Sequence, residues 1–122
     1  MELVLWICQG LLAAVFLLSG GAKVSMSKPR LLATGQTGVA PFPVPVIRLV
    51  AVCELAAVVG LIGPAATGIL PVLTGFAAVG LSVLMIGAMA SHASLREPLP
   101  VVVNFVILLV CCFVAVGRLT GH

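Results

Sequence analysis

Five polar side chains in otherwise apolar stretches are the candidates for chemistry: Lys23, Arg48, Glu54, His92 and Asn104. Glu54 stands in the middle of the run "RLVAVCELAAVVGL". Inside a bilayer, an ionisable group costs about 2.5–3.5 kcal/mol on insertion scales, and such groups are rare unless they serve a function. We therefore assign Glu54 and His92 to acid–base catalysis, and Lys23, Arg48 and Asn104 to binding.

Each of the five residues also has a purely structural interpretation. Glu54 and Asn104 could join helices by hydrogen bonds, and Lys23 could anchor a helix end at the membrane surface. Arg48 could instead pair with loop carbonyls or a lipid phosphate, and His92 could be an interfacial residue at a helix end. Arg48 and Glu54 are six residues apart, about 240° around a helix, so they do not share a face. Glu54 then needs a partner from another helix, which Lys23, His92 or Asn104 could supply, or it stays protonated.

The composition requires lipid around most of the chain. Of the 122 residues, 62% are hydrophobic and 7% are charged, whereas soluble domains carry about 25% charged residues. No basic run with interleaved aromatic residues is present, so we expect no nucleic-acid partner. The opening Met1-Glu2 lacks the basic start of a signal peptide, and we expect the first apolar segment to be a permanent helix.

Four apolar segments are each near the roughly 20 residues that a helix needs to cross a bilayer. They cover about residues 3–24, 44–63, 69–91 and 98–118, with Gly63-Pro64 expected to end the second. Backbone groups in lipid must be paired within each segment, which excludes open strands. Short links make neighbouring helices antiparallel. We predict an all-α fold, an integral membrane antiparallel four-helix bundle, as a single domain over residues 1–122.

The connection at residues 25–43 is the only sizeable loop. Its end, "PFPVP", is expected to be extended, because each proline removes a donor and restricts the residue before it. It also carries Leu31, Leu32, Val39 and Phe42, more apolar groups than a solvated loop needs. We expect this segment to fold over one mouth of the bundle as a lid.

The polar candidates fall in the same half of the bundle. In an antiparallel arrangement, Lys23 ends the first helix where the second begins, and His92 ends the third where the fourth, with Asn104, begins. Together under the lid they predict a polar pocket inside the membrane.

The basic residues predict the orientation of the chain. Lys23, Lys28, Arg30 and Arg96 flank the half with the lid, and Arg118 flanks the other. The positive-inside rule places the lid in the cytoplasm and both termini outside, which in a bacterium means a multi-pass protein of the plasma membrane.

Other motifs point to little chemistry. A lone histidine with a glutamate is too little for a metal site, and we expect neither a metal nor a cofactor. The cysteines have no CxxC spacing and are interpreted as small hydrophobic residues: Cys8, Cys53, Cys111 and Cys112. Small residues four apart, such as Gly10 with Ala14, predict close helix packing within the chain or in a homodimer. Trp6 and Arg118 are interpreted as markers of the outer membrane interface.

The chain resembles the DoxX-like family of small four-helix bacterial membrane proteins. The resemblance covers nearly the whole chain and rests on Gly-x-x-Lys at 20–23, the Arg and Glu of 48–54, Ala-x-x-x-His at 88–92, and Asn104. It implies a four-helix membrane bundle. Some relatives look like membrane partners of redox systems that handle quinones or thiols. Because this chain lacks a pair of cysteines on one helix face, a thiol-exchange role is disfavoured.

Two functional hypotheses follow. In the first, the pocket binds a lipophilic molecule of isoprenoid or quinone type among the membrane lipids, and Glu54 serves isomerisation, cyclisation or quinone-linked redox chemistry as general acid or base. In the second, the protein is a non-catalytic anchor or accessory subunit that holds a soluble redox partner, and its polar residues only lock the helices together.

Overall fold

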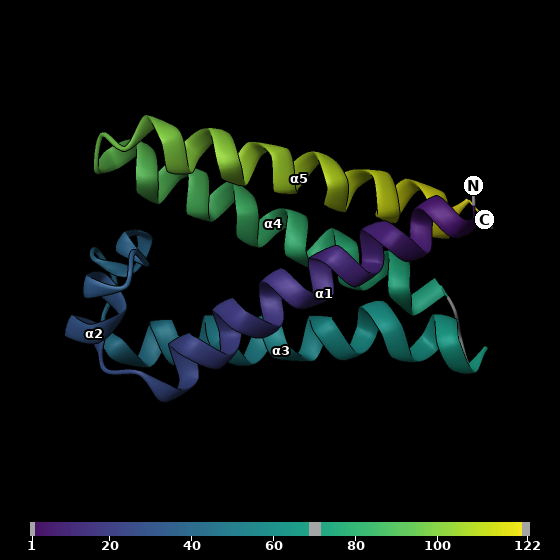
Figure 1. Cartoon of the computed structure of the whole chain (residues 1–122), viewed down its shortest axis with the longest axis horizontal. Coiled ribbons are helices and arrows are strands. Elements are labelled where there is room, and N and C mark those ends of the chain that lie inside the picture. The colour runs from purple at the N-terminus through teal and green to yellow at the C-terminus, as the bar shows by residue number, and fades with distance from the viewer. Residues whose placement is uncertain (1, 69–71, 121–122) are drawn as a thin grey trace.

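Four long helices make up most of the molecule (Figure 1). The computed structural model describes residues 2–68 and 72–120. The long helices are α1 (Glu2–Ser25), α3 (Val44–Thr67), α4 (Val72–Ser94) and α5 (Pro98–Leu119). All four are long and apolar enough to cross a membrane. The all-α, antiparallel four-helix bundle predicted from the sequence is confirmed, and both described ends of the chain lie at the same end of the bundle.

The connection between α1 and α3 is partly helical. It contains α2 (Lys28–Ala33) and the short 3₁₀ helix η1 (Thr37–Val39), and we call residues 26–43 the lid. Leu31 of α2 and Val39 of η1 are buried against Ile47 of α3. The apolar residues of the lid therefore pack on the bundle end instead of facing solvent, beside the ends of α1 and α3 (Figure 1).

Two helix boundaries differ from those predicted from proline. The helix expected to stop at Gly63-Pro64 continues to Thr67 and ends at Gly68, whose φ of 73° provides the left-handed C-cap. Pro64 removes a single intrahelical donor, which a helix tolerates one turn from its end. Likewise "PFPVP" is extended only at Pro43, because Pro41 and Phe42 form a turn and a bend after η1. Pro45 occupies the first turn of α3, where a missing N–H costs nothing. The third predicted helix continues past residue 91 to Ser94, and its expected start at residue 69 lies outside the described residues.

Helix α1 crosses the bundle diagonally. Near its start, Leu5 lies against Gly117 of α5, where an added Cβ would come within 2.7 Å of the leucine. Near its end, Gly20 lies against α3, where an added Cβ would be 3.0 Å from Leu55 and 3.1 Å from the carbonyl oxygen of Ala51. The two glycines thus set the crossing, and the α1–α3 and α4–α5 pairs diverge toward the end that carries the lid (Figure 1).

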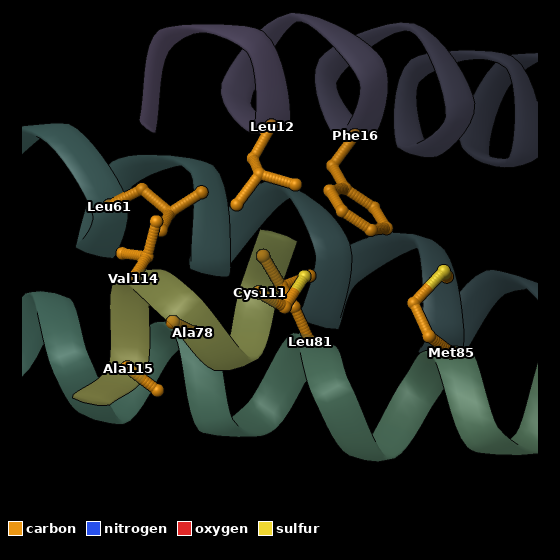
Figure 2. Packing of buried hydrophobic residues seen from close by; sticks show 9 residues of the cluster. All are labelled: Leu12, Phe16, Leu61, Ala78, Leu81, Met85, Cys111, Val114 and Ala115. Carbon is orange, nitrogen blue, oxygen red and sulfur yellow. The ribbon is translucent and has the colours of Figure 1, made fainter. Parts of the chain in front are cut away.

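A single hydrophobic cluster fills the middle of the bundle and draws on all four helices (Figure 2). Its buried members are Leu12, Phe16, Leu61, Ala78, Leu81, Met85, Cys111, Val114 and Ala115. The remaining large apolar side chains are mostly exposed, as expected for helices whose outer surfaces face lipid. Packing of these interdigitated side chains, together with close helix approach, holds the spans together.

The contact between α3 and α4 at Gly60 leads to a stability prediction. A Cβ at Gly60 would lie 2.9 Å from the Cβ of Ala77, which is fixed to its backbone and cannot move aside. We expect Gly60→Ala to lower the free energy of unfolding in detergent by about 1–3 kcal/mol, because the helices must separate. The control is Gly80→Ala, where nothing lies within 4 Å and helix propensity favours alanine by up to about 1 kcal/mol. Equal stability of the two variants would contradict this packing.

Candidate functional site

The buried carboxyl group of Glu54 is the centre of the candidate site. Glu54 is 1% exposed, and Nζ of Lys23 donates to its Oε1 at 2.6 Å. The same ammonium group donates to Oγ of Ser19 at 2.9 Å. The other carboxyl oxygen, Oε2, is buried and has no hydrogen-bond partner among the described residues. One oxygen of the carboxyl group is therefore neutralised by α1, and the other is left as an unused acceptor.

The close approach of α1 to α3 creates this ion pair. Gly20 lets the two backbones meet at Ala51 and Leu55, and Lys23 follows one turn later, so its side chain reaches Glu54. Nη1 of Arg48 donates to the backbone carbonyl of Lys23, in the last turn of α1, where carbonyl groups lack intrahelical donors. Arg48 thus fixes the end of α1 and is not among the residues that line the cavity described below. Its role in binding stays a prediction.

A cavity of about 280 Å³ lies beside the Lys23–Glu54 pair. Residues of all four long helices and of the lid line it, including Glu54, Lys23, His92 and Asn104. Phe16 and Met85, which belong to the hydrophobic cluster (Figure 2), also line the cavity, so the core forms one of its walls. The cavity sits where the two helix pairs diverge. Its walls are mainly apolar, with a few polar groups, which is typical of small-molecule pockets.

The polar groups on the cavity wall differ in how far they are satisfied. Asn104 is half-buried and makes no side-chain hydrogen bond within residues 2–68 and 72–120. Gln36 of the lid, which was not predicted as a site residue, is also half-buried and makes no side-chain hydrogen bond within the same residues. Ser19 was also missed, although its position four residues before Lys23 predicts a contact within α1. A ligand in the cavity could therefore form hydrogen bonds with Oε2 of Glu54 and with the side-chain amides of Asn104 and Gln36.

His92 is engaged by a different carboxylate. Its Nδ1 lies 2.9 Å from Oε1 of Glu97, and Thr37 of η1 donates to the same oxygen at 2.8 Å. Ser91 donates to the backbone carbonyl of Gly38 at 2.6 Å. The end of α4 thus holds the lid by side-chain hydrogen bonds. His92 lines the cavity but is not the partner of Glu54, so of the three partners considered for that carboxyl group the structure selects Lys23.

The contact of the lid with His92 and Glu97 favours the ionised form of Glu97. Hydrogen bonds from His92 and then Thr37 lower the pKa of Glu97 from its ordinary value of 4.5. Gly38 packs against the imidazole so closely that an added Cβ would be 2.8 Å from Nε2. The glycine therefore allows the lid backbone to reach the histidine, and the carboxylate holds it there.

A second polar cluster at the opposite end of the bundle was not predicted. Gln9 is fully buried, donating to the carbonyl of Leu61 at 2.7 Å and accepting from Nε of Arg118 at 2.6 Å. Arg118 also donates to both carboxyl oxygens of Glu2 at 3.0 Å and lies 5.7 Å from the ring centre of Trp6. The presence of Gln9 inside an apolar segment could have indicated this cluster from the sequence. Arg118 of α5 thus connects the last helix to Gln9, Glu2 and Trp6 of the first.

Comparison with known proteins identifies relatives only at the level of a family. The model of the DoxX-like family matches residues 7–114, which include every candidate residue of the cavity. No curated protein and no solved structure matches the chain. Within the described residues, no group of three or more His, Cys, Asp or Glu side chains is placed to hold a metal ion.

The ion pair leads to a prediction on stability. Lys23→Met or Glu54→Leu alone leaves one buried charge unpaired, and each should lower the free energy of unfolding by about 3 kcal/mol. The double variant should lose clearly less than the sum of the two, because neither charge remains. A double-mutant cycle in detergent measures this coupling. Strictly additive losses would mean that the two side chains do not interact.

The lid contact leads to a prediction on pH. Because folding lowers the pKa of Glu97, its contribution is present at pH values above 4.5 and is lost as the pH falls below that value. Hydrogen exchange should show protection of lid amides near Thr37 at pH 7, and this protection should decrease below pH 4.5. Glu97→Ala should reduce it already at pH 7, whereas Glu2→Ala, at the other end of the molecule, should not. Unchanged lid protection in Glu97→Ala would refute the contact.

Proposed function

We propose that this chain, which belongs to the DoxX-like family and is a multi-pass membrane protein, binds a lipophilic molecule in the cavity beside Glu54. The observation that carries the proposal is Oε2 of Glu54, a buried acceptor without a partner in the described part of the chain. Leaving such a group unsatisfied costs about 1–3 kcal/mol, and more for a charged one. A bound ligand that supplies a hydrogen bond removes this cost.

The walls of the cavity support entry from the lipid phase. Val15 of α1 and Val83 of α4 line the cavity and are also 41% and 64% exposed. On a bundle with four membrane-spanning helices, such exposed apolar side chains face lipid. We place the entrance of the ligand beside these two side chains, between α1 and α4, where α1 crosses away from the α4–α5 pair. Its volume is near the lower limit of about 300 Å³ for small-molecule pockets, so the polar end of the ligand would lie inside and its apolar remainder between the helices.

The same geometry supports proton transfer to the ligand. Glu54 is held by Lys23 in a mainly apolar cavity, where a positioned acid or base contributes about 10²–10⁴ to a rate. In an isomerisation of an isoprenoid, the carboxylate of Glu54 would take a proton from one carbon of the ligand at Oε2 and, as the carboxylic acid, return it to another carbon, so a single carboxyl group serves both steps. His92 keeps the lid closed over the reaction in this proposal. The lid faces the cytoplasm of a bacterial cell, because Lys28, Arg30 and Arg96 lie at its end of the bundle.

Ligand retention can be tested with a matched pair of glycine variants. Gly87 lines the cavity, whereas Gly80 lies two turns away on the same face of α4, outside it. An added Cβ meets nothing within 4 Å at either position. Wild type and Gly80→Phe should retain a lipophilic molecule through purification, detected by mass spectrometry of extracted lipids. Gly87→Phe should retain at least about tenfold less, because its side chain obstructs the opening. Identical lipid profiles in all three proteins would overturn the proposal.

A further inference from the structure

We infer that the polar end of the ligand is an uncharged hydroxyl group, as in a long-chain alcohol or a phenol, and that it donates its hydrogen bond to Oε2 of Glu54. This inference rests on the proposed function and specifies its ligand. It excludes apolar molecules whose only polar atoms are carbonyl or ether oxygens.

The ion pair determines that the ligand must be a donor. Nζ of Lys23 donates to Oε1, which leaves Oε2 as the buried acceptor without a partner in the described residues. A ketone, ester or ether offers only acceptor lone pairs, so it would leave Oε2 unsatisfied and place a second partial negative charge beside it. An O–H or N–H group satisfies it directly.

The charge of the site determines that the donor must be neutral. Lys23 and Glu54 together carry no net charge, and His92 at the lid is paired with Glu97. An ammonium group on the ligand would bring an uncompensated positive charge next to Lys23, and a carboxylate or phosphate would face Oε2. Either charge would have to leave water for a mainly apolar cavity at a large cost. A neutral hydroxyl group avoids both penalties.

Asn104 supplies the complementary contact. It lines the same cavity from α5 and makes no side-chain hydrogen bond among the described residues. Its amide carries two N–H donors, so it can donate to a hydroxyl oxygen while the hydroxyl hydrogen is directed at Oε2. A hydroxyl group donates and accepts at one atom, so it can bond both Oε2 of Glu54 and the amide of Asn104. An amide or indole N–H group fits less well, because its nitrogen is a poor acceptor.

Farnesol and its methyl ether provide the test, because they share the same apolar chain and differ in the donor hydrogen. Binding of each to the full-length protein in lipid nanodiscs can be measured by competition with radiolabelled farnesol. Hydrogen bonds to charged groups are strong enough that wild type should bind the alcohol at least about tenfold more tightly than the ether. Glu2→Gln, an acid at the other end of the bundle, should keep this ratio.

The variant Glu54→Gln should reverse the preference. A glutamine whose carbonyl accepts from Lys23 presents an N–H₂ group in place of Oε2, so the ether should bind as well as the alcohol or better. An alcohol preference that survives in Glu54→Gln would overturn the assignment of the hydroxyl to Oε2. The ratio of the affinities of wild type for farnesol and its ether requires no variant, so it tests the inference even if Glu54→Gln does not fold.

The outcomes also separate this inference from the function on which it rests. Equal binding of farnesol and its ether by wild type, with both lowered by Gly87→Phe and neither by Gly80→Phe, would keep the lipophilic pocket and refute the hydroxyl. Absence of binding by either probe would refute both.

Discussion

A carboxyl group buried within four apolar helices is the constraint around which this molecule is organised. Glu54 is tolerated because Lys23 comes from a neighbouring helix to meet it at 2.6 Å, and breaking such a pair is far more costly than forming it is favourable. That requirement fixes the approach of α1 to α3 through Gly20, and Arg48 holds the end of α1 in the same register. The pair therefore sets helix geometry as well as local charge.

The diagonal course of α1 links this ion pair to the cavity. A helix that contacts α5 near its start and α3 near its end must leave the α4–α5 pair at the second end. The hydrophobic cluster fills the middle of the bundle, and the cavity begins on the lid side of this cluster, where Phe16 and Met85 line it. The lid covers the diverging end through Thr37 and Gly38. The crossing of α1 therefore leaves one half of the bundle packed and the other half hollow. In the packed half, hydrogen bonds of Gln9 join α1 to α3 and α5.

Sequence alone predicted the fold class, because hydropathy and segment length determine what lipid permits. It also selected Glu54, Lys23 and Asn104, since polar residues are conspicuous in apolar runs. It misjudged Pro64, because the C-cap glycine and not the proline ends α3. It missed the Glu97 contact that occupies His92, and it missed Gln9, because pairing across helices depends on rotation and crossing angle, which periodicity does not encode. The weakly amphipathic helices carry little information about which face is buried.

The central claim is that Oε2 of Glu54 completes its hydrogen bonding with a ligand from the membrane. A structure determined in nanodiscs of the native host lipids tests it most directly. This account predicts elongated density that begins within hydrogen-bond distance of Oε2 and leaves the bundle between α1 and α4. A cavity filled by the protein's own side chains, with Oε2 bonded to one of them, would contradict it.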